Sequence, residues 1–293
     1  TTHSTPQAAM VALHTKYGTV LYCNDFKFDS FPVLGKKPNF KRLKELGNKG
    51  VKLLICDSTR ADDPKKTPSE NVARQMLKDL LLGIESDGKA IIVTTFSSHI
   101  ARLKSIIEYG QRINRKVVLL GRSLAKYVKA AERVNLVNFS KSAKIVGYSS
   151  KVQSALKLLE KNKNKYLLIV TGHQGETKSV LSKIARGDFE FKLEKDDCVI
   201  FSCSVIPNQI NIDAREHLEE LLKHKHVRIF KDIHVSGHAA KEDLRDLINM
   251  VKPINLIPAH CEERMKMAMK ELAHECSVPH VILMNDGERK EIR

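Results

Sequence analysis

Apolar residues in this chain form short runs that alternate with longer stretches of helical periodicity. The short runs predict β-strands at residues 51–56, 90–94, 117–120, 166–170, 198–203, 227–230, 254–257 and 281–284. Apolar residues recur at helical spacing between them, which predicts helices at 70–84, 99–114, 123–133, 212–222, 241–251 and 261–273. Such alternation is typical of a parallel sheet covered by helices.

The first part of the chain has a different pattern. Residues 8–24 contain two apolar segments separated by Lys16-Tyr17-Gly18, which predicts an antiparallel hairpin. Residues 60–68 are polar and include Pro64 and Pro68, so they are the best candidate for a domain boundary. A length of 293 residues suits two domains of ordinary size.

Composition adds a strong charge to this picture. The formal net charge is +16, which favours polyanionic partners such as nucleic acid or acidic lipid. The chain has no Trp and only 5% aromatic residues, so phosphate contacts should outweigh base stacking. A hydrophobic fraction of 42% is enough for packed cores.

Cysteine usage and hydropathy indicate the cellular setting. None of the six cysteines forms a C-x-x-C pair, so neither a zinc ribbon nor a disulfide framework is predicted. The sequence shows no apolar run of roughly 18 residues and no secretory leader. We therefore expect no membrane association and a reducing cytoplasm as the location.

The candidate chemistry lies at the predicted strand ends. Five histidines follow strands or lie in loops, and two carboxylates join them: His3, His99, His234, His238, His260, Asp25 and Asp57. In α/β folds the carboxyl ends of strands face the binding site, so these side chains are candidates for one site. The alternative for each is a packed histidine or a turn aspartate, and none is decisive alone.

Two loops have features of phosphate binding. His234-Val235-Ser236-Gly237-His238 combines donor side chains with a glycine that lets a ligand approach the backbone. The segment 171–176 (Thr-Gly-His-Gln-Gly-Glu) follows a strand and is predicted to open a helix, which is also phosphate geometry, although a simple helix cap explains it equally well. No G-x-G-x-x-G or P-loop lysine is present, which argues against dinucleotide or NTP binding.

Ten short motifs, in order along the chain, resemble those of ribonuclease J, a family in the β-CASP branch of the metallo-β-lactamase fold. They occupy residues 2–6, 25–29, 56–59, 67–70, 96–102, 121–123, 171–176, 201–207, 234–239 and 258–262. The resemblance implies an α/β protein with a four-layer αββα metallo-β-lactamase domain and an inserted Rossmann-like β-CASP domain. It places the first domain at 1–67 and 225–293, and the inserted domain at 68–224.

The resemblance also implies roles for individual residues. His3 and His260 would each ligate one of two zinc ions, and Asp25 would bridge the ions. Asp57 and His238 would form the pair that protonates the leaving oxygen, and the nucleophile would be a metal-bound hydroxide. Two further sets would bind RNA: a phosphate clamp of His234, Ser236, Gly237 and His238, and an RNA path in the cleft between the domains, lined by His99, Ser202 and Ser204.

The sequence departs from the family pattern in two places. The H-x-H-x-D-H motif, which supplies further metal ligands in the family, is absent, and His224-Lys225-His226 does not replace it. We therefore expect an N-terminally truncated chain that is inactive alone. Cys261 stands where the family usually has Gly. There is no room for the C-terminal domain of bacterial members, so the chain resembles the shorter archaeal type.

The resemblance implies that the intact protein is a zinc-dependent 5′-to-3′ exoribonuclease of RNA decay, with endonucleolytic cleavage as a further activity and a homodimer as the intact form. Two alternatives remain at this point. One is a non-catalytic RNA-binding fragment, which the charge and the missing ligands favour. The other is a metallo-β-lactamase-type hydrolase of small esters, against which the inserted domain and the phosphate-type loops count.

Overall fold

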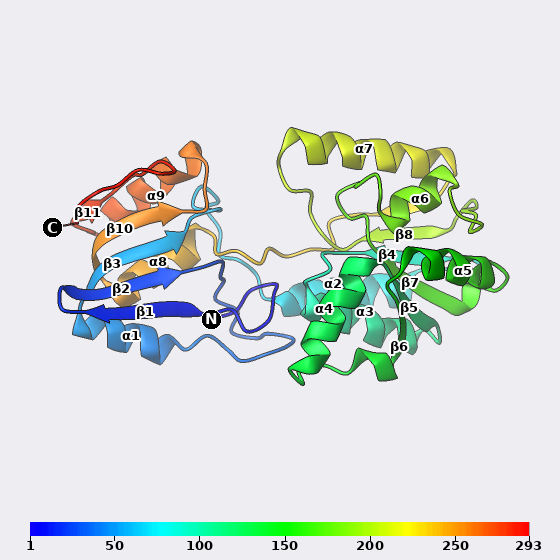
Figure 1. Cartoon of the computed structure of the whole chain (residues 1–293), viewed down its shortest axis with the longest axis horizontal. Coiled ribbons are helices and arrows are strands. Elements are labelled where there is room, and N and C mark those ends of the chain that lie inside the picture. The colour runs from blue at the N-terminus through cyan, green and yellow to red at the C-terminus, as the bar shows by residue number, and fades with distance from the viewer. Residues whose placement is uncertain (293) are drawn as a thin grey trace. The chain divides into compact units, whose positions relative to one another are not determined.

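The computed structural model describes residues 1–292, which divide into two compact units (Figure 1). Unit 1 combines Thr1–Glu70 with the chain from Ser236 onward, and unit 2 is Asn71–Val235. The predicted boundary at 67/68 lies close to this division. The return to unit 1 comes at Ser236 rather than near 225, because strand β9 (Arg228–Phe230) pairs in parallel with β8 (Cys198–Phe201) of unit 2.

Unit 1 is built on a five-stranded sheet in the order β1-β2-β3-β10-β11. Its strands are β1 (Met10–Thr15), β2 (Gly18–Cys23), β3 (Val51–Asp57), β10 (Pro253–Ala259) and β11 (His280–Val281). The predicted hairpin is confirmed, with β1 and β2 antiparallel and Thr15 opposite Gly18. The other strand pairs are parallel, so β2, β3 and β10 all end at the same edge.

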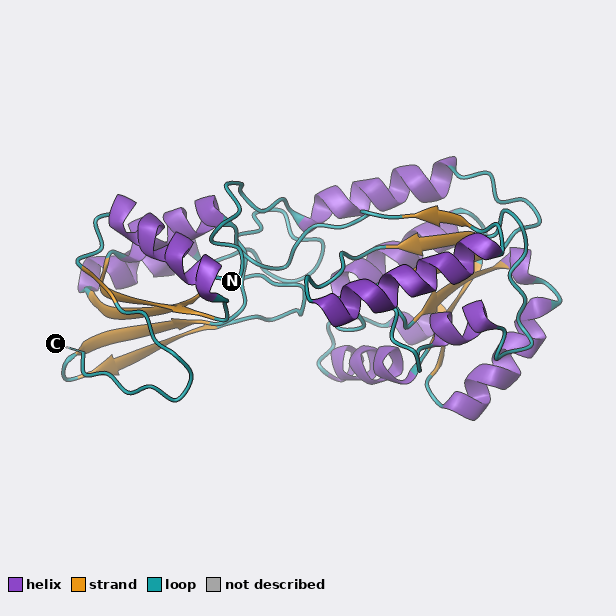
Figure 2. Ribbon diagram, turned by 90° about the horizontal axis from the view of Figure 1, so that it is seen from above, coloured by secondary structure: helices purple, strands orange, loops and turns teal. Residues whose placement is uncertain are grey.

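Three helices cover one face of this sheet: α1 (Phe40–Lys49), α8 (Lys241–Val251) and α9 (Glu263–Glu275) (Figure 2). Their buried side chains, such as Leu46, Leu247 and Leu272, join one core cluster with strand residues. Helix α1 approaches α8 closely because Gly47 has no side chain. A Cβ there would lie 2.1 Å from the Met250 carbonyl oxygen.

No helix and no second sheet of unit 1 packs on the opposite face of the sheet within residues 1–292. Leu53 and Asn255 in the middle of this face are nonetheless buried, and its exposed part lies on β1. Cross-strand register places Val11 beside Tyr22 and Leu13 beside Val20 on this face. Val11 and Leu13 are 57% and 60% exposed. The described part of unit 1 therefore has two layers, one of helices and one of strands, and the four-layer arrangement stays a prediction.

Unit 2 contains a six-stranded, fully parallel sheet in the order β6-β5-β7-β4-β8-β9. The strands not yet introduced are β4 (Ile91–Thr94), β5 (Lys116–Leu120), β6 (Ala143–Val146) and β7 (Tyr166–Val170). The helices are α2 (Glu70–Gly83), α3 (Ile100–Arg112), α4 (Arg122–Arg133), α5 (Ser149–Glu160), α6 (Val180–Arg186) and α7 (Gln209–His224), with short 3-10 turns at Phe139–Lys141 and Lys163–Lys165.

Helices cover both faces of the second sheet. Alternate strand residues such as Ile92, Leu168 and Phe201 share a core cluster with α5, α6 and α7. Their neighbours Ile91, Leu167 and others are also buried but lie outside that cluster, and α3 and α4 contact β5. The predicted parallel sheet covered by helices is thus confirmed for unit 2. Among residues 1–292, no helix is both long and apolar enough to cross a bilayer.

Candidate functional site

Three candidate residues of unit 1 meet because their strands are parallel neighbours. Asp25 follows β2, Asp57 ends β3, and His260 follows β10. Cys23 pairs with Cys56, and Ala259 pairs with Asp57, so the three strand ends are in register. The sheet therefore delivers two carboxylates and an imidazole to one edge.

The N-terminal segment brings His3 to the same edge. Thr2 forms an isolated antiparallel bridge with Lys27, and its hydroxyl donates to the Lys27 carbonyl at 2.6 Å. The same hydroxyl accepts from the backbone N–H of Asp29 at 3.0 Å. Because Thr2 is tied on both sides, the adjacent His3 is held beside the loop that carries Asp25.

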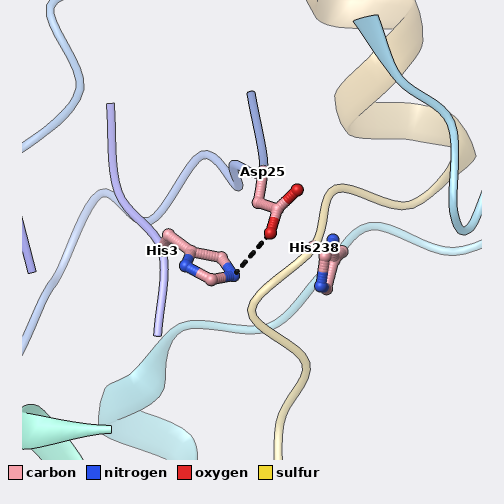
Figure 3. A group of neighbouring side chains, drawn as sticks. All are labelled: His3, Asp25 and His238. Carbon is pink, nitrogen blue, oxygen red and sulfur yellow. Dashed lines mark ion pairs between the residues drawn. The ribbon is translucent and has the colours of Figure 1, made fainter. Parts of the chain in front are cut away.

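Asp25 lies between two imidazoles. Its Oδ1 is 2.9 Å from Nδ1 of His260, and its Oδ2 is 4.0 Å from Nε2 of His3. Figure 3 shows the His3 ring and the Asp25 carboxylate pointing toward one another, with His238 close by on a separate loop. Two groups of three possible ligands share Asp25: one adds His3 and His238, the other adds Asp57 and His260. One carboxylate is thus shared by two overlapping groups of possible cation ligands.

The donor set suits zinc, which binds imidazole nitrogen and carboxylate oxygen. Zinc binding through Nε2 of His3 would nevertheless require a change in the tautomer of the ring. Its Nδ1 accepts the Thr5 backbone N–H at 3.2 Å, so in the neutral ring the proton lies on Nε2, which faces Asp25. Ligation through Nε2 requires the proton on Nδ1 and therefore the loss of the Thr5 contact.

Asp57 and His238 form a hydrogen-bonded pair, with Asp57 Oδ2 2.7 Å from His238 Nδ1. The other Asp57 oxygen accepts the backbone N–H and the hydroxyl of Thr59. Burial raises the pKa of Asp57, but the hydrogen bonds from His238 and Thr59 outweigh it and hold that pKa below its ordinary value. Burial likewise lowers the pKa of His238, but Asp57 outweighs it and the net pKa is raised.

The loop that carries His238 is packed against His3. The two rings meet edge to face with centroids 5.2 Å apart. Gly237 permits this approach, because a Cβ there would lie 2.2 Å from Ser4 Oγ and 3.0 Å from the His3 ring. Ser236 Oγ accepts the His238 backbone N–H at 3.0 Å, which fixes the turn. In this structure Gly237 allows His3 to pack closely against the loop. The sequence had suggested a different reason for the glycine, namely the approach of a ligand to the backbone.

His260 occupies a left-handed backbone conformation, with φ of 56°. Few residues other than glycine adopt it, and histidine is among those enriched there. Thr59 Oγ1 lies 2.9 Å from the His260 carbonyl oxygen, so its single hydroxyl proton is shared between this carbonyl and the Asp57 carboxylate. The neighbouring Cys261 is half-buried, and burial raises the pKa of its thiol to about 11. Cys261 is thus a neutral thiol at neutral pH.

The remaining candidates lie in unit 2, so the four-residue phosphate clamp is divided between units and remains a prediction. His234 is half-buried, and Ser204 is exposed. His99 is 3% exposed and precedes α3. Ser202 is fully buried, accepts from Arg102 Nη1 at 2.9 Å and donates to the Ile233 carbonyl. A hydroxyl engaged in this way supports the loop, and the geometry does not favour its direct contact with RNA.

The predicted phosphate loop at residues 171–176 is occupied by its own contacts. The backbone N–H of Gln174 donates to Glu176, and the Gln174 side chain donates to Ser204 O and accepts from Ile206 N. The loop also does not open a helix directly. Helix α6 begins later, at Val180, and Ser179 caps it. The expected geometry of a strand leading straight into a helix N-terminus is therefore wrong here.

Comparisons with known proteins agree with these motifs. Residues 88–216 match the model "Ribonuclease J, beta-CASP domain", and residues 214–283 match "Zn-dependent metallo-hydrolase RNA specificity domain". The chain belongs to the ribonuclease J family. It is 46% identical to the ribonuclease J proteins of Methanocaldococcus jannaschii and Pyrococcus abyssi, in each case over 94% of this chain. The Helicobacter pylori (strain 26695) ribonuclease J is 34% identical over 99% of the chain and 41% of its own length.

The chain spans about three fifths of the length of the two archaeal relatives, 61% and 60% respectively.

The sequence analysis did not identify three residues that support the candidate residues. Thr2 and Thr59 position His3, Asp57 and His260, and the fully buried Arg102 ties Ser202 to the Ile233 carbonyl. All three lie inside motifs of the resemblance, which was the available signal, but their roles depend on contacts across the fold.

Proposed function

We propose that this chain is part of a metal-dependent ribonuclease that hydrolyses phosphodiester bonds of RNA in the 5′-to-3′ direction. The observation that carries the proposal is the carboxylate of Asp25 between His3 and His260, beside the hydrogen-bonded Asp57–His238 pair. Membership in the ribonuclease J family supports RNA as the substrate. We also propose a homodimer as the assembled form and the cytoplasm as its location.

His3 and His260 would each hold one zinc ion, and Asp25 would hold both. Two such ions, when bound, activate water and stabilise the charge that develops on the phosphate. The imidazole and carboxylate donors around Asp25 support this assignment. Unit 1 would then belong to the metallo-β-lactamase domain and unit 2 to the β-CASP domain, which the matched residues 88–216 support.

His238 would donate a proton to the leaving oxygen of the RNA. Asp57 holds Nδ1 of the ring, so Nε2 is the atom that can face a substrate. The raised pKa of His238 favours the protonated ring near neutral pH. Asp57 is almost fully buried and fixed by Thr59, so it orients the imidazole without rotating away.

The chain alone would bind its metals weakly. In each three-residue group, one member belongs to the Asp57–His238 pair and already has a hydrogen-bond partner. That leaves His3 with Asp25 at one position and Asp25 with His260 at the other. Catalytic zinc usually has about three protein ligands, so a segment carrying H-x-H-x-D-H is expected to restore metal binding and cleavage.

The proposal is tested by cleavage of a labelled RNA with this chain joined to such a segment. His238→Ala should slow cleavage at least about 10²-fold, the usual scale for lost acid–base help. His274→Ala, an exposed histidine of α9, is the matched control and should leave the rate unchanged. A His238→Ala protein that cleaves within a few-fold of wild type, with its melting temperature unchanged, would show that the assigned role is wrong.

A further inference from the structure

The sheet of unit 2 has an open edge at β6, which pairs only with β5. Helices α4 and α5 both contact β6, and a hollow of about 1030 Å³ lies between them. A second hollow of about 490 Å³ shares Arg122, Gly147 and Tyr148 with it, and a third of about 780 Å³ shares Ser140, Lys144 and other residues. The three hollows share lining residues, and we call the surface that they form the β6 groove; helices α4 and α5 and strand β6, which contribute to its lining, are labelled in green in Figure 1.

The β6 groove is strongly basic. Its main hollow is lined by five cationic residues and one acidic residue, Glu132. Glu132 is occupied, because its carboxylate accepts the backbone N–H and the hydroxyl of Ser140. The two adjoining hollows add further exposed or half-buried cations and one more acidic residue, Glu176, whose carboxylate accepts the backbone N–H of Gln174. The cationic side chains along the groove are Lys183, Lys178, Arg122, Lys126, Lys129, Lys151, Lys144, Lys141 and Lys116.

These cations are not neutralised by the protein itself. Within residues 1–292, Arg122, Lys126, Lys129 and Lys144 have no carboxylate at ion-pair distance. Elsewhere in unit 2, exposed lysines do pair, as Lys157 does with Glu190 at 2.8 Å. Like charges gathered in a groove raise the local concentration of counter-ions, so the groove favours a ligand with repeated negative charge.

An added strand or a second copy of this chain fits the groove less well. Lys144 lies within β6 and is exposed, and an edge-strand lysine is a common device against edge-to-edge pairing. A second copy would also bring its own lysines against these. A flexible polyanion with regularly spaced charges avoids both problems.

Tyr148 adds a feature specific to nucleic acid. It lies in both the main and the smaller hollow, is 73% exposed, and has Lys151 Nζ 5.7 Å from its ring centre. Exposed aromatic rings beside cations provide stacking platforms for unpaired bases. We propose that the β6 groove binds single-stranded RNA through its phosphates, with one base stacked on Tyr148. The identification of the polyanion as RNA rests on the proposed function.

The test measures binding of a fluorescent 20-nucleotide single-stranded RNA by anisotropy at several salt concentrations. EDTA is present throughout, so binding is separated from metal and cleavage. The quadruple variant Lys126→Gln, Lys129→Gln, Lys144→Gln and Lys151→Gln should bind at least about tenfold more weakly at physiological salt. Its slope of log affinity against log salt should fall by about 3, because each phosphate contact to a single strand contributes about 0.7.

The matched control removes the same charge from exposed lysines of unit 2 outside the groove: Lys161→Gln, Lys192→Gln, Lys195→Gln and Lys223→Gln. Circular dichroism melts establish that both proteins are folded. If the control loses as much affinity as the groove variant, or the groove variant binds RNA like wild type, the inference is overturned. Loss of polyglutamate binding with unchanged RNA binding would assign the groove to an acidic peptide instead. Failure of the proposed function would appear separately, as absent cleavage with groove-dependent RNA binding intact.

Discussion

Asp25 lies between histidines from opposite ends of the chain, and its position depends on small residues as much as on the ligands. The hydroxyl of Thr2 fixes the N-terminal segment, and Thr59 fixes Asp57 and the His260 backbone. Gly237 lets the His238 loop pack on His3. At this scale the site is sensitive to a single added carbon atom.

Gly237→Ala should weaken zinc binding about tenfold or more while the protein stays folded. The new methyl group would lie 2.2 Å from Ser4 Oγ, which can rotate, and 3.0 Å from His3, which must shift away from Asp25. Isothermal titration with zinc, in protein carrying the H-x-H-x-D-H segment, measures the change. Gly83→Ala is the control, since nothing lies within 4 Å of a Cβ there. Equal zinc affinity in the two variants would contradict the packing argument.

At the scale of elements, the sequence predicted most helices and strands because buried faces leave a periodic apolar pattern. The helix α8 and strand β7 match the predicted ranges 241–251 and 166–170. Helix α1 was missed, since only Leu43 and Leu46 are buried in it. Strand β6 was missed because its four residues include an exposed lysine. The predicted strand 198–203 ends at Phe201, because the buried Ser202 and Cys203 belong to the following loop.

The sequence indicated which residues are candidates for the site, but not the side-chain contacts that hold them in place. Motifs indicated Asp25, Asp57, His238 and His260, and parallel register then explains why three of them share an edge. The buried state of Ser202, in contrast, follows from its contacts with Arg102 and Ile233, which are distant in sequence. Local sequence patterns carry no information on such contacts.

A cluster of three charged residues in unit 2, namely Lys163, Glu194 and Asp197, allows a prediction about stability. The side chain of Lys163 is 9% exposed and lies 3.1 Å from the fully buried Asp197 and 2.8 Å from Glu194. Lys163→Met would leave the Asp197 carboxylate with only the backbone N–H groups of Ala90 and Glu194. We expect unit 2 to lose about 3 kcal/mol, measured by urea unfolding. The exposed Lys161→Met is the control and should change stability by less than about 0.5 kcal/mol.

The same cluster predicts how this loss depends on pH. Burial lowers the pKa of Lys163, but Glu194 and Asp197 outweigh it and raise that pKa above 10.5, while Lys163 holds the pKa of Glu194 below 4.5. The stabilisation from Lys163 is therefore present below pH 10.5 and is lost as pH rises further. The stabilisation from Glu194 is present above pH 4.5 and is lost at lower pH. A wild-type-to-Lys163→Met difference that stays constant from pH 3 to pH 12 would contradict the ion-pair account.

The exposed apolar residues of strand β1 in the first sheet predict self-association. Val11 and Leu13 are both more than half exposed on the edge strand β1, which among residues 1–292 pairs only with β2. The double variant Val11→Thr, Leu13→Thr keeps strand propensity while removing apolar surface, so it should shift the chain toward monomer in sedimentation at high concentration. The control Val72→Thr, Leu82→Thr removes comparable exposed residues from helix α2. The account fails if both double variants associate like wild type.

At the scale of the whole molecule, two units with separate cores carry a net charge of +16. Unit 1 holds the carboxylates and histidines of the candidate metal site. Unit 2 holds the basic β6 groove. Part of this charge lies in the groove, where cations outnumber carboxylates, and RNA is the partner that we propose for both units.

Zinc content and RNA cleavage, measured together for the wild type and for Asp25→Asn, test the central claim most directly. Both proteins carry the added H-x-H-x-D-H segment, and Asp246→Asn, an exposed carboxylate of α8 paired with Lys66, is the control. If Asp25 holds both metals, the wild type and the control should bind two zinc ions per chain and cleave RNA. Asp25→Asn should retain less than one zinc ion and no measurable cleavage, with its fold intact. Two tightly bound zinc ions and wild-type cleavage in Asp25→Asn would contradict the account of this site.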